Sequence, residues 1–335
     1  MTLLSDSFLN HSIMISMNVE IDSNSDLVIG ADIGGSNIRV ALVDSSGNLL
    51  IRKKIDNKPS LGIEIAGEKI SELALEVSKN KAIKGMGFSS AGPINQLTGE
   101  YLNPPNLSEW NKKSLIPIIR KYTGIESKVG HDATLAALAE INFGKNKGSK
   151  NLIYLTISTG VGAGMISNGN MIQGENWFAG EVGHIIVSPG GYGCSLGCPG
   201  CLEGNISGTA IASITKDMIK NGHNTEILEN NNIEDINSKL VIDFAQKKDK
   251  LSEIIINDVL ENLGRGLASI LATLNPSVII LGGSVAEGLS KFYWDKIITK
   301  TAKYSIPFYK SDPPIQMTTL GEDASILGAS IIASS

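Results

Sequence analysis

One local pattern occurs twice in this chain of 335 residues. An apolar strand leads into a glycine-rich turn, a second strand follows, and a polar turn leads into a third strand. The two copies are predicted at residues 27–33, 38–43 and 49–55, and at residues 152–158, 163–167 and 171–173. The polar turns between the second and third strands have the Asn, Asp, Ser and Gly content typical of hairpins. The repetition predicts two similar halves, each built on a sheet.

Helical patterns alternate with these strands. Residues 63–79 place Ile63, Ala66, Ile70, Leu73 and Val77 on one stripe, which is the spacing of an amphipathic helix. Further helices are predicted at residues 133–143, 251–274 and 324–333, a short buried strand at residues 278–281, and a surface loop at residues 221–237. Strands that alternate with helices indicate an α/β protein.

The composition limits the classes of function. The length suggests about two domains. A net charge of −5 argues against a nucleic-acid or anionic-membrane binder, which would need a basic face. No apolar stretch approaches the roughly 18 residues that cross a bilayer. Residues 1–27 contain no Lys or Arg, so they lack the charged start of a secretory signal. We therefore expect a cytoplasmic protein that binds neither nucleic acid nor membranes, with a disordered leader at residues 1–26.

The two glycine-rich turns are candidate phosphate sites. The first turn runs from Asp32 to Asn37, and the second runs from Ser158 to Gly164. Glycine leaves backbone N–H groups accessible, and such concave sets of N–H groups bind anions. Asp32, at the end of its strand, could hold Mg²⁺ through water. The alternative is that both turns are only structural. A P-loop motif and a dinucleotide-binding GxGxxG motif are both absent from the sequence.

Asp132 is the candidate general base. It follows His131 at the start of the predicted helix at residues 133–143. A carboxylate at that place could accept a proton from a hydroxyl group of a bound substrate. Capping of the helix is the alternative role, because Asp is common at helix starts.

All three cysteines of the chain lie within eight positions. Cys194, Cys198 and Cys201, together with His184, could supply four tetrahedral ligands to a structural zinc ion. Three free thiols in a loop are the alternative. Glu181 and Glu203 bracket this segment and could bind a ligand with several hydroxyl groups, unless they only solvate the surface. A His184 that binds zinc through one nitrogen would orient its other nitrogen toward such a ligand.

Seven motifs, taken in order, resemble the ROK family (repressors, open reading frames and sugar kinases) of the actin-like and hexokinase ATPase superfamily. They are DIGGSNIRVALVD at 32–44, AGPINQLTGEYLNPPNL at 91–107, HDATLAALAE at 131–140, STGVGAG at 158–164, EVGH at 181–184, CSLGCPGCLE at 194–203 and IILGGSVAEG at 279–288. Two actin-like (ribonuclease H-like) domains on either side of a central cleft are the fold that this resemblance implies. The N-terminal domain is predicted at residues 27–130, joined by a C-terminal helix at 322–335, and the larger domain at residues 131–321.

The resemblance also implies an activity, ATP-dependent phosphorylation of a hexose at its 6-hydroxyl group. Asp132 matches the catalytic base of the family. Sugar-contacting positions of the family correspond here to Gly92, Asn103, Glu181, His184 and Glu203. Phosphate-binding positions correspond to Gly34, Gly35, Ser36, Asn37, Thr159, Gly160 and Gly162, with Gly282 and Gly283 near adenosine. ATP with Mg²⁺, a structural zinc ion and a homodimer are expected on the same grounds.

Two positions depart from the family pattern. Leu196 stands where the family usually has its second cysteine, and Cys198 could substitute for it. His131 stands where many relatives have an Asn that contacts the sugar, and an imidazole is bulkier and can titrate near neutral pH. The sugar preference could shift as a result.

Several functions stay open at this level. Glucose is the expected substrate, and N-acetylmannosamine or N-acetylglucosamine is the alternative, since the same motifs serve all three. A sugar-responsive repressor would need a DNA-binding module, for which the residues before Asp32 are too few. A sugar sensor without activity is less consistent with an intact Asp132 and two intact glycine turns.

Overall fold

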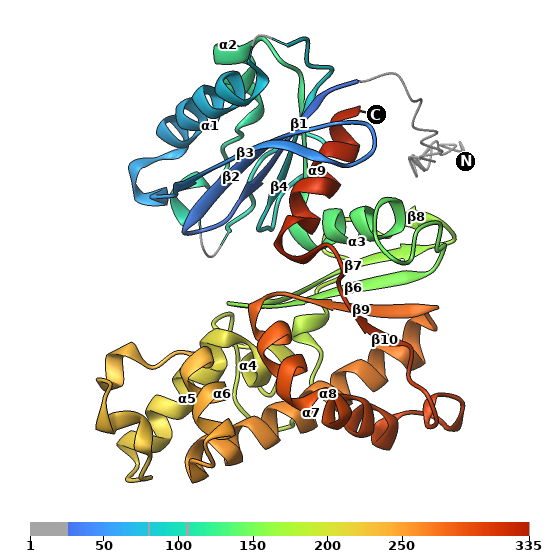
Figure 1. The fold of residues 1–335 in the computed structure, drawn as a ribbon. Coiled ribbons are helices and arrows are strands. Elements are labelled where there is room, and N and C mark those ends of the chain that lie inside the picture. Colours follow the sequence, from blue (N-terminus) through green and yellow to red (C-terminus); the bar gives the residue numbers. More distant parts are fainter. Residues whose placement is uncertain (1–25, 80, 105–106, 335) are drawn as a thin grey trace, which may run out of the picture.

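The computed structural model describes residues 26–79, 81–104 and 107–334. Within these residues the chain forms two five-stranded sheets with helices on both faces of the first and around the second (Figure 1). The predicted α/β class is confirmed. The leader predicted at residues 1–26 lies outside the described residues except for its last position.

The first sheet comes from the N-terminal half of the chain. Its strands, in spatial order, are β3 (Leu49–Asp56), β2 (Asn37–Val43), β1 (Val28–Ile33), β4 (Met86–Ser90) and β5 (Ser127–His131). β2 pairs antiparallel with both β1 and β3, whereas β4 pairs parallel with β1 and β5. The first three strands are the three that the sequence pattern predicts.

The second sheet repeats this arrangement. Its order is β8 (Asn170–Met171), β7 (Val161–Ser167), β6 (Leu152–Ile157), β9 (Val278–Gly282) and β10 (Ile315–Met317). β7 pairs antiparallel with its two neighbours, and β9 pairs parallel with its two neighbours. The two sheets therefore share both strand order and strand direction, which confirms the predicted pair of similar halves.

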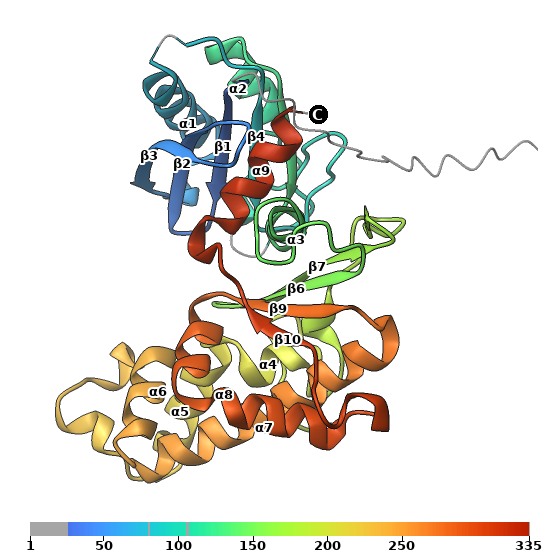
Figure 2. The ribbon, with the colours of Figure 1, turned by 45° about the vertical axis from the view of Figure 1, so that its right-hand side comes forward.

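Two helices lie between the sheets (Figures 1 and 2). α3 (Asp132–Asn142) packs on β6 and β7 of the second sheet, and α9 (Ala324–Ser334) packs on β1 and β4 of the first. The two helices also pack on each other. The end of the chain thus returns to the first sheet.

The other helices cover the outer faces. α1 (Ile63–Ser78) and α2 (Ile116–Thr123) lie on the outer face of the first sheet. The predicted stripe of α1 faces that sheet, and Ile63, Ile70 and Val77 are fully buried. The outer side of the second sheet carries α4 (Leu202–Ile206), α5 (Gly208–Lys220), α6 (Ser238–Gln246), α7 (Lys250–Leu274) and α8 (Ser284–Tyr304).

The segment at residues 221–237 is mostly exposed, as predicted for a surface loop, but it is more ordered than the prediction implies. It contains two short 3-10 helices, Glu226–Glu229 and Ile233–Asp235. Ile227 and Ile236 are both buried in the core of the second half. Isolated apolar residues in an Asn-rich stretch do not make a periodic pattern, so the sequence does not reveal these anchors.

No helix among the described residues is both long and apolar enough to cross a membrane.

Glycines set how closely the central layers approach. A Cβ atom at Gly87 in β4 would lie 1.9 Å from the backbone oxygen of Ala329 in α9. A Cβ atom at Gly328 would lie 1.9 Å from the backbone oxygen of Leu135 in α3. Backbone oxygens cannot move aside as a side-chain end can, so the packing of α9 requires hydrogen at both positions.

Gly328→Ala is expected to destabilise the fold although alanine favours helices. Overpacking of this kind costs about 2 kcal/mol, more than the ~1 kcal/mol that alanine contributes to helix formation. The matched control is Gly288→Ala in α8, where the new Cβ would meet only the end of the Ile242 side chain at 3.2 Å. Urea unfolding should show a loss for the first variant and no loss for the second. Equal stability of the two variants would contradict the close approach of α3 and α9.

Candidate active site

The glycine turn between β1 and β2 is held in shape by Asn57. The Gly34 N–H donates to the oxygen of Asn37 at 2.9 Å. The amide group of Asn57 donates to the Gly34 oxygen at 2.7 Å, and its backbone N–H donates to the Ser36 oxygen at 2.8 Å. The N–H groups of Gly35 and Ser36 have no backbone partner among the described residues. The turn therefore offers free donors on a fixed backbone, and Asn57 is a residue that sequence reasoning missed.

The turn between β6 and β7 is held by Glu203. One carboxylate oxygen, Oε2, accepts a hydrogen bond from the Val161 N–H at 2.9 Å. The same oxygen would lie 2.8 Å from a Cβ atom at Gly160. The first residue of α5 also contacts this turn: the Gly208 N–H donates to the Ser158 oxygen at 2.7 Å. Glu203 is thus fixed against the second turn.

Gly282 and Gly283 lie next to this second turn. Gly282 is paired with Thr156 at the end of the parallel strands β6 and β9. Gly283 has a φ of +91°, and a Cβ atom there would lie 2.5 Å from the Ile157 oxygen. The hydroxyl groups of Ser158 and Ser284 are 3.1 Å apart. Two of the predicted nucleotide segments therefore lie together at one end of the second sheet.

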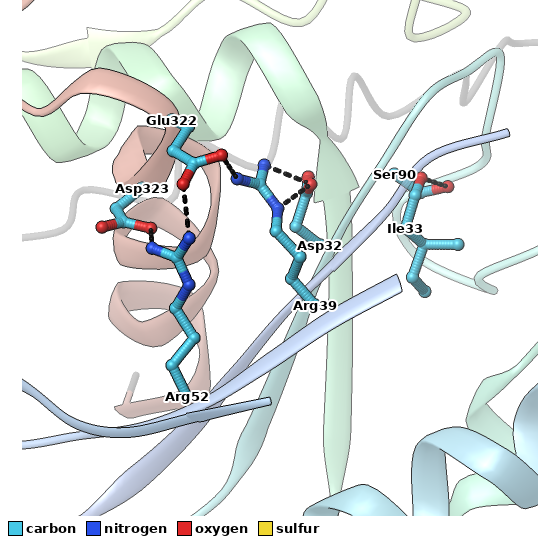
Figure 3. A network of polar contacts seen from close by, with 7 residues as sticks. All are labelled: Asp32, Ile33, Arg39, Arg52, Ser90, Glu322 and Asp323. Carbon is cyan, nitrogen blue, oxygen red and sulfur yellow. Dashed lines mark hydrogen bonds and ion pairs between the residues drawn. The ribbon is translucent and has the colours of Figure 1, made fainter. Parts of the chain in front are cut away.

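Asp32 forms an ion pair that sequence analysis does not predict. The Arg39 guanidinium contacts its Oδ2 atom at 2.7 Å, and both side chains are largely buried (Figure 3). A signal for this pair exists in the sequence. The short turn pairs Ile33 with Ile38, so Asp32 lies directly opposite Arg39 in the antiparallel hairpin. The other oxygen, Oδ1, accepts no hydrogen bond from any residue that the structure describes.

His131 and Asp132 occupy the junction of β5 and α3. His131 lies between the halves: its ring is 2.9 Å from a Cβ atom built at Gly92 and 3.6 Å from one built at Gly162. The Nε2 atom of His131 is 3.4 Å from Oδ1 of Asp132. His131 is the N-cap residue of α3, and its side chain makes no capping hydrogen bond. Oδ1 of Asp132 accepts a hydrogen bond from the N–H of Ala133 at 2.6 Å.

The pKa of Asp132 is raised above the usual value of 3.8. Burial by the surrounding protein is the main cause, and the negative charge of Asp32 adds to it. The charge of His131 and the Ala133 N–H oppose the shift. The side chain is still 37% exposed, so one side of the carboxyl group is open. A carboxylate with a raised pKa and an open side is suited to accept a proton.

His184 connects Glu181 to the cysteine segment. Its Nε2 atom is 3.6 Å from Oε2 of Glu181, and its Nδ1 atom is 3.6 Å from the sulfur of Cys194. The ligand atoms of His184, Cys194 and Cys201 all lie within 4.8 Å of one another. Three of the four predicted zinc ligands are therefore together.

Cys198 does not belong to this group of three. It is half-buried, like Cys194, and follows Leu196, which is 62% exposed. Gly197 and Gly200, on either side of Cys198, both have positive φ angles. The segment is therefore bent sharply at both sides of the fourth predicted ligand.

Asn103 shares no hydrogen bond or ion pair with the other predicted sugar-contacting residues in the described part of the chain. It is exposed on the connection between β4 and α2, with a φ of +53°. Its backbone N–H donates to the side chain of Asn111 at 2.8 Å, which fixes the loop rather than the Asn103 side chain.

Comparisons with known proteins identify the family of this chain. The profile of the ROK family matches residues 28–335. A glucokinase of Thermotoga maritima is 30% identical over 306 residues, which cover 91% of this chain and 96% of that protein. An N-acetylmannosamine kinase of Yersinia pestis is 30% identical over 307 residues, with coverage of 91% and 97%.

A solved structure has the same fold. A ROK family glucokinase from Streptomyces griseus, in complex with glucose and AMPPNP, superimposes with a TM-score of 0.78 at 27% identity. The match covers 92% of this chain and 99% of that one. The family match over nearly all described residues, together with these relatives, shows that the chain belongs to the ROK family.

Proposed function

We propose that this protein is an ATP-dependent sugar kinase that phosphorylates a hexose at the 6-hydroxyl group, with glucose as its preferred substrate. One observation carries the proposal. Two sheets of identical topology each end in a glycine turn, the first turn has N–H groups without a backbone partner, and Asp132, whose pKa is raised, begins α3 directly after β5. The glucokinase relatives support the choice of glucose.

The nucleotide would lie across the two turns. The phosphates would accept hydrogen bonds from the N–H groups of Gly35 and Ser36 in the first turn, which Gly34 and Asn37 border. In the second turn they would lie against Thr159 and Gly160, with Gly162 beside them in β7. Gly282 and Gly283 would border the adenosine. The free Oδ1 atom of Asp32 suits a water molecule of hydrated Mg²⁺, which prefers oxygen ligands and keeps several waters. In phosphoryl transfer the bound Mg²⁺ neutralises charge on the phosphates.

Asp132 would remove the proton from the attacking hydroxyl group of the sugar. Its pKa above 3.8 brings it nearer to that of an efficient base at neutral pH. Gly92, Asn103, His131, Glu181, His184 and Glu203 are the proposed sugar-binding residues. Because Oε2 of Glu203 is taken by Val161, its other oxygen would serve the sugar.

N-acetylmannosamine or N-acetylglucosamine is the alternative substrate. The N-acetylmannosamine kinase relative is as similar in sequence as the glucokinase relative, 30% in both cases. The deciding feature is the space around the second carbon of the sugar, where an acetamido group needs more room than a hydroxyl group.

A structural zinc ion is proposed for the cysteine segment. A nitrogen of His184 and the sulfurs of Cys194 and Cys201 form a donor set that suits zinc, and their spacing fits a shared ion. Cys198 is proposed as the fourth ligand, since it is the remaining thiol of the same segment. The division into domains at residues 27–130 and 131–321, the homodimer and the cytoplasmic location stay predictions.

The first test is release of ADP from Mg-ATP with a panel of sugars. Glucose, mannose, fructose, N-acetylglucosamine and N-acetylmannosamine would each be compared by kcat/KM. We expect glucose to give the highest value. A higher value for an acetamido sugar would replace glucose by that substrate. A folded protein without turnover on any sugar would instead be the sensor, and the kinase proposal would fail.

Asp132→Asn is expected to lower kcat by at least about a thousandfold, because the amide cannot accept the hydroxyl proton. The matched control is Glu140→Gln, which removes another buried carboxyl group with a raised pKa from the same helix, outside the turns. The control should keep its activity. Similar losses in both variants would indicate damage to α3 rather than loss of a base.

The pH dependence follows from the raised pKa of Asp132. Because the base must be ionised, kcat/KM should fall as the pH drops through this pKa, which lies above 3.8. The ionised carboxyl group also costs the folded state stability: this cost develops as the pH rises from 3.8 to the raised pKa and is fully present above it. Asp132→Asn should therefore melt no lower than the wild type at neutral pH. A lower melting temperature would contradict the burial of this carboxyl group.

Cys201→Ser is expected to abolish zinc binding, because it removes a buried sulfur of the three-residue group. Cys198→Ser is the matched change at a half-buried thiol outside that group and should lower the zinc content less. Metal analysis of protein purified without chelators should find about one zinc per wild-type chain. Absence of zinc from the wild type would refute the site.

A further inference from the structure

Five charged side chains form a continuous network beside the first glycine turn (Figure 3). In order they are Asp32 on β1, Arg39 on β2, Glu322, Arg52 on β3, and Asp323. Glu322 and Asp323 lie in the 3-10 helix Gly321–Asp323, on the connection that leads from β10 of the second sheet to α9. The network thus joins the turn to the segment that links the two halves.

Arg39 is the centre of this network. Its Nε and Nη2 atoms donate to the same oxygen of Asp32, Oδ2, at 3.2 and 2.7 Å. Its third nitrogen, Nη1, donates to Oε2 of Glu322 at 3.1 Å. All three nitrogens of the guanidinium group are therefore engaged, and its plane is fixed by two carboxylates.

Burial differs strongly along the network. The side chains of Asp32 and Arg39 are only 16% and 15% exposed, whereas Glu322 is 64% exposed and Arg52 is 36% exposed. Solvent screens exposed ion pairs, so the Arg52 pairs contribute little. The Asp32–Arg39 pair is screened much less, and loss of Arg39 would leave a largely buried carboxylate without its partner.

The position of the pair matters because Asp32 has a neighbouring carboxylate. The charge of Asp32 acts on Asp132, the proposed base. A polyphosphate bound between them would bring further negative charge. Arg39 offsets the charge of Asp32 while it holds only Oδ2, so Oδ1 stays free and in a fixed place.

We infer that Arg39 is a positioning residue for nucleotide binding: it holds Asp32 so that Oδ1 faces hydrated Mg²⁺, and Glu322 fixes the guanidinium group in turn. This inference rests on the proposed kinase function. Arg39 supplies positive charge next to the phosphates and orients the carboxylate, whereas Arg52 stabilises only the outer part of the network.

Titration calorimetry with Mg-AMPPNP tests the inference without turnover. The variants are Arg39→Met and Arg52→Met, which each remove one guanidinium group from the same network. Arg39→Met should weaken binding by about tenfold or more, the scale expected when a charged hydrogen-bonded partner is lost. Arg52→Met should change binding by less than about twofold, because its pairs are exposed.

Two further variants separate positioning from folding. Arg39→Lys restores the charge but cannot bridge two carboxylates through a planar fork, so it should recover part of the affinity. Glu322→Gln should weaken binding in the same direction as Arg39→Met, but less. If Arg39→Met does not fold, these two variants decide the question.

The outcomes are distinct. Weak binding confined to Arg39 and Glu322 variants would support the inference. Equal effects of Arg39→Met and Arg52→Met would overturn the inference, because a purely structural network predicts that both changes weaken binding alike. Tighter binding by Arg39→Met would also overturn it, since Arg39 would then compete with the cation for Asp32. A wild type that does not bind Mg-AMPPNP at all would overturn the proposed kinase function, and the inference with it.

Discussion

Backbone-to-backbone packing in the central layer is the constraint on which the site depends. α3 packs on the second sheet and α9 packs on the first, and the two helices contact each other through Gly328. Because α3 begins at Asp132, immediately after β5, its position relative to both sheets also places the proposed base. His131 shows the result, with its ring between Gly92 of one half and Gly162 of the other. A bulkier central layer would move the two glycine turns apart.

Much of the fold follows from local sequence, because each half begins with strands whose apolar residues and turns are contiguous. β1, β2 and β3 match their predictions closely, and so does α1. The sequence does not predict elements whose own residues show little hydrophobic periodicity. β10 has only three residues, and its place beside β9 depends on pairing with a strand more than 30 residues earlier. The ends of α7 and α9 are predicted well. Pro276 marks the end of α7, and a run of small apolar residues marks α9.

The candidate site divides in the same way. Asp132, which a motif singles out, lies at the start of a helix that the sequence predicts, and its role as the base stays a prediction. Residues that act through distant contacts were not found: Asn57 closes a turn more than 20 residues earlier, and Glu322 meets Arg39 across 283 positions. Cys198 illustrates the reverse case. Sequence spacing allows it as a zinc ligand, but spacing alone does not reveal how the glycines beside it bend the loop.

The connection from β10 to α9 makes polar contacts with both halves, and its charged residues supply the contacts with the first half. On the side of the second sheet, Thr318 donates to the buried carboxyl group of Glu140, whose pKa is raised by burial. On the side of the first sheet, Glu322 contacts Arg39 and Arg52. Any rotation of one half against the other must strain one of these attachments. The attachment at Glu322 is the weaker one, because the Glu322 side chain is 64% exposed and solvent screens its ion pairs. Movement between the halves would therefore disturb the contacts of Arg39 before those of Glu140, next to Asp32 at the proposed nucleotide site.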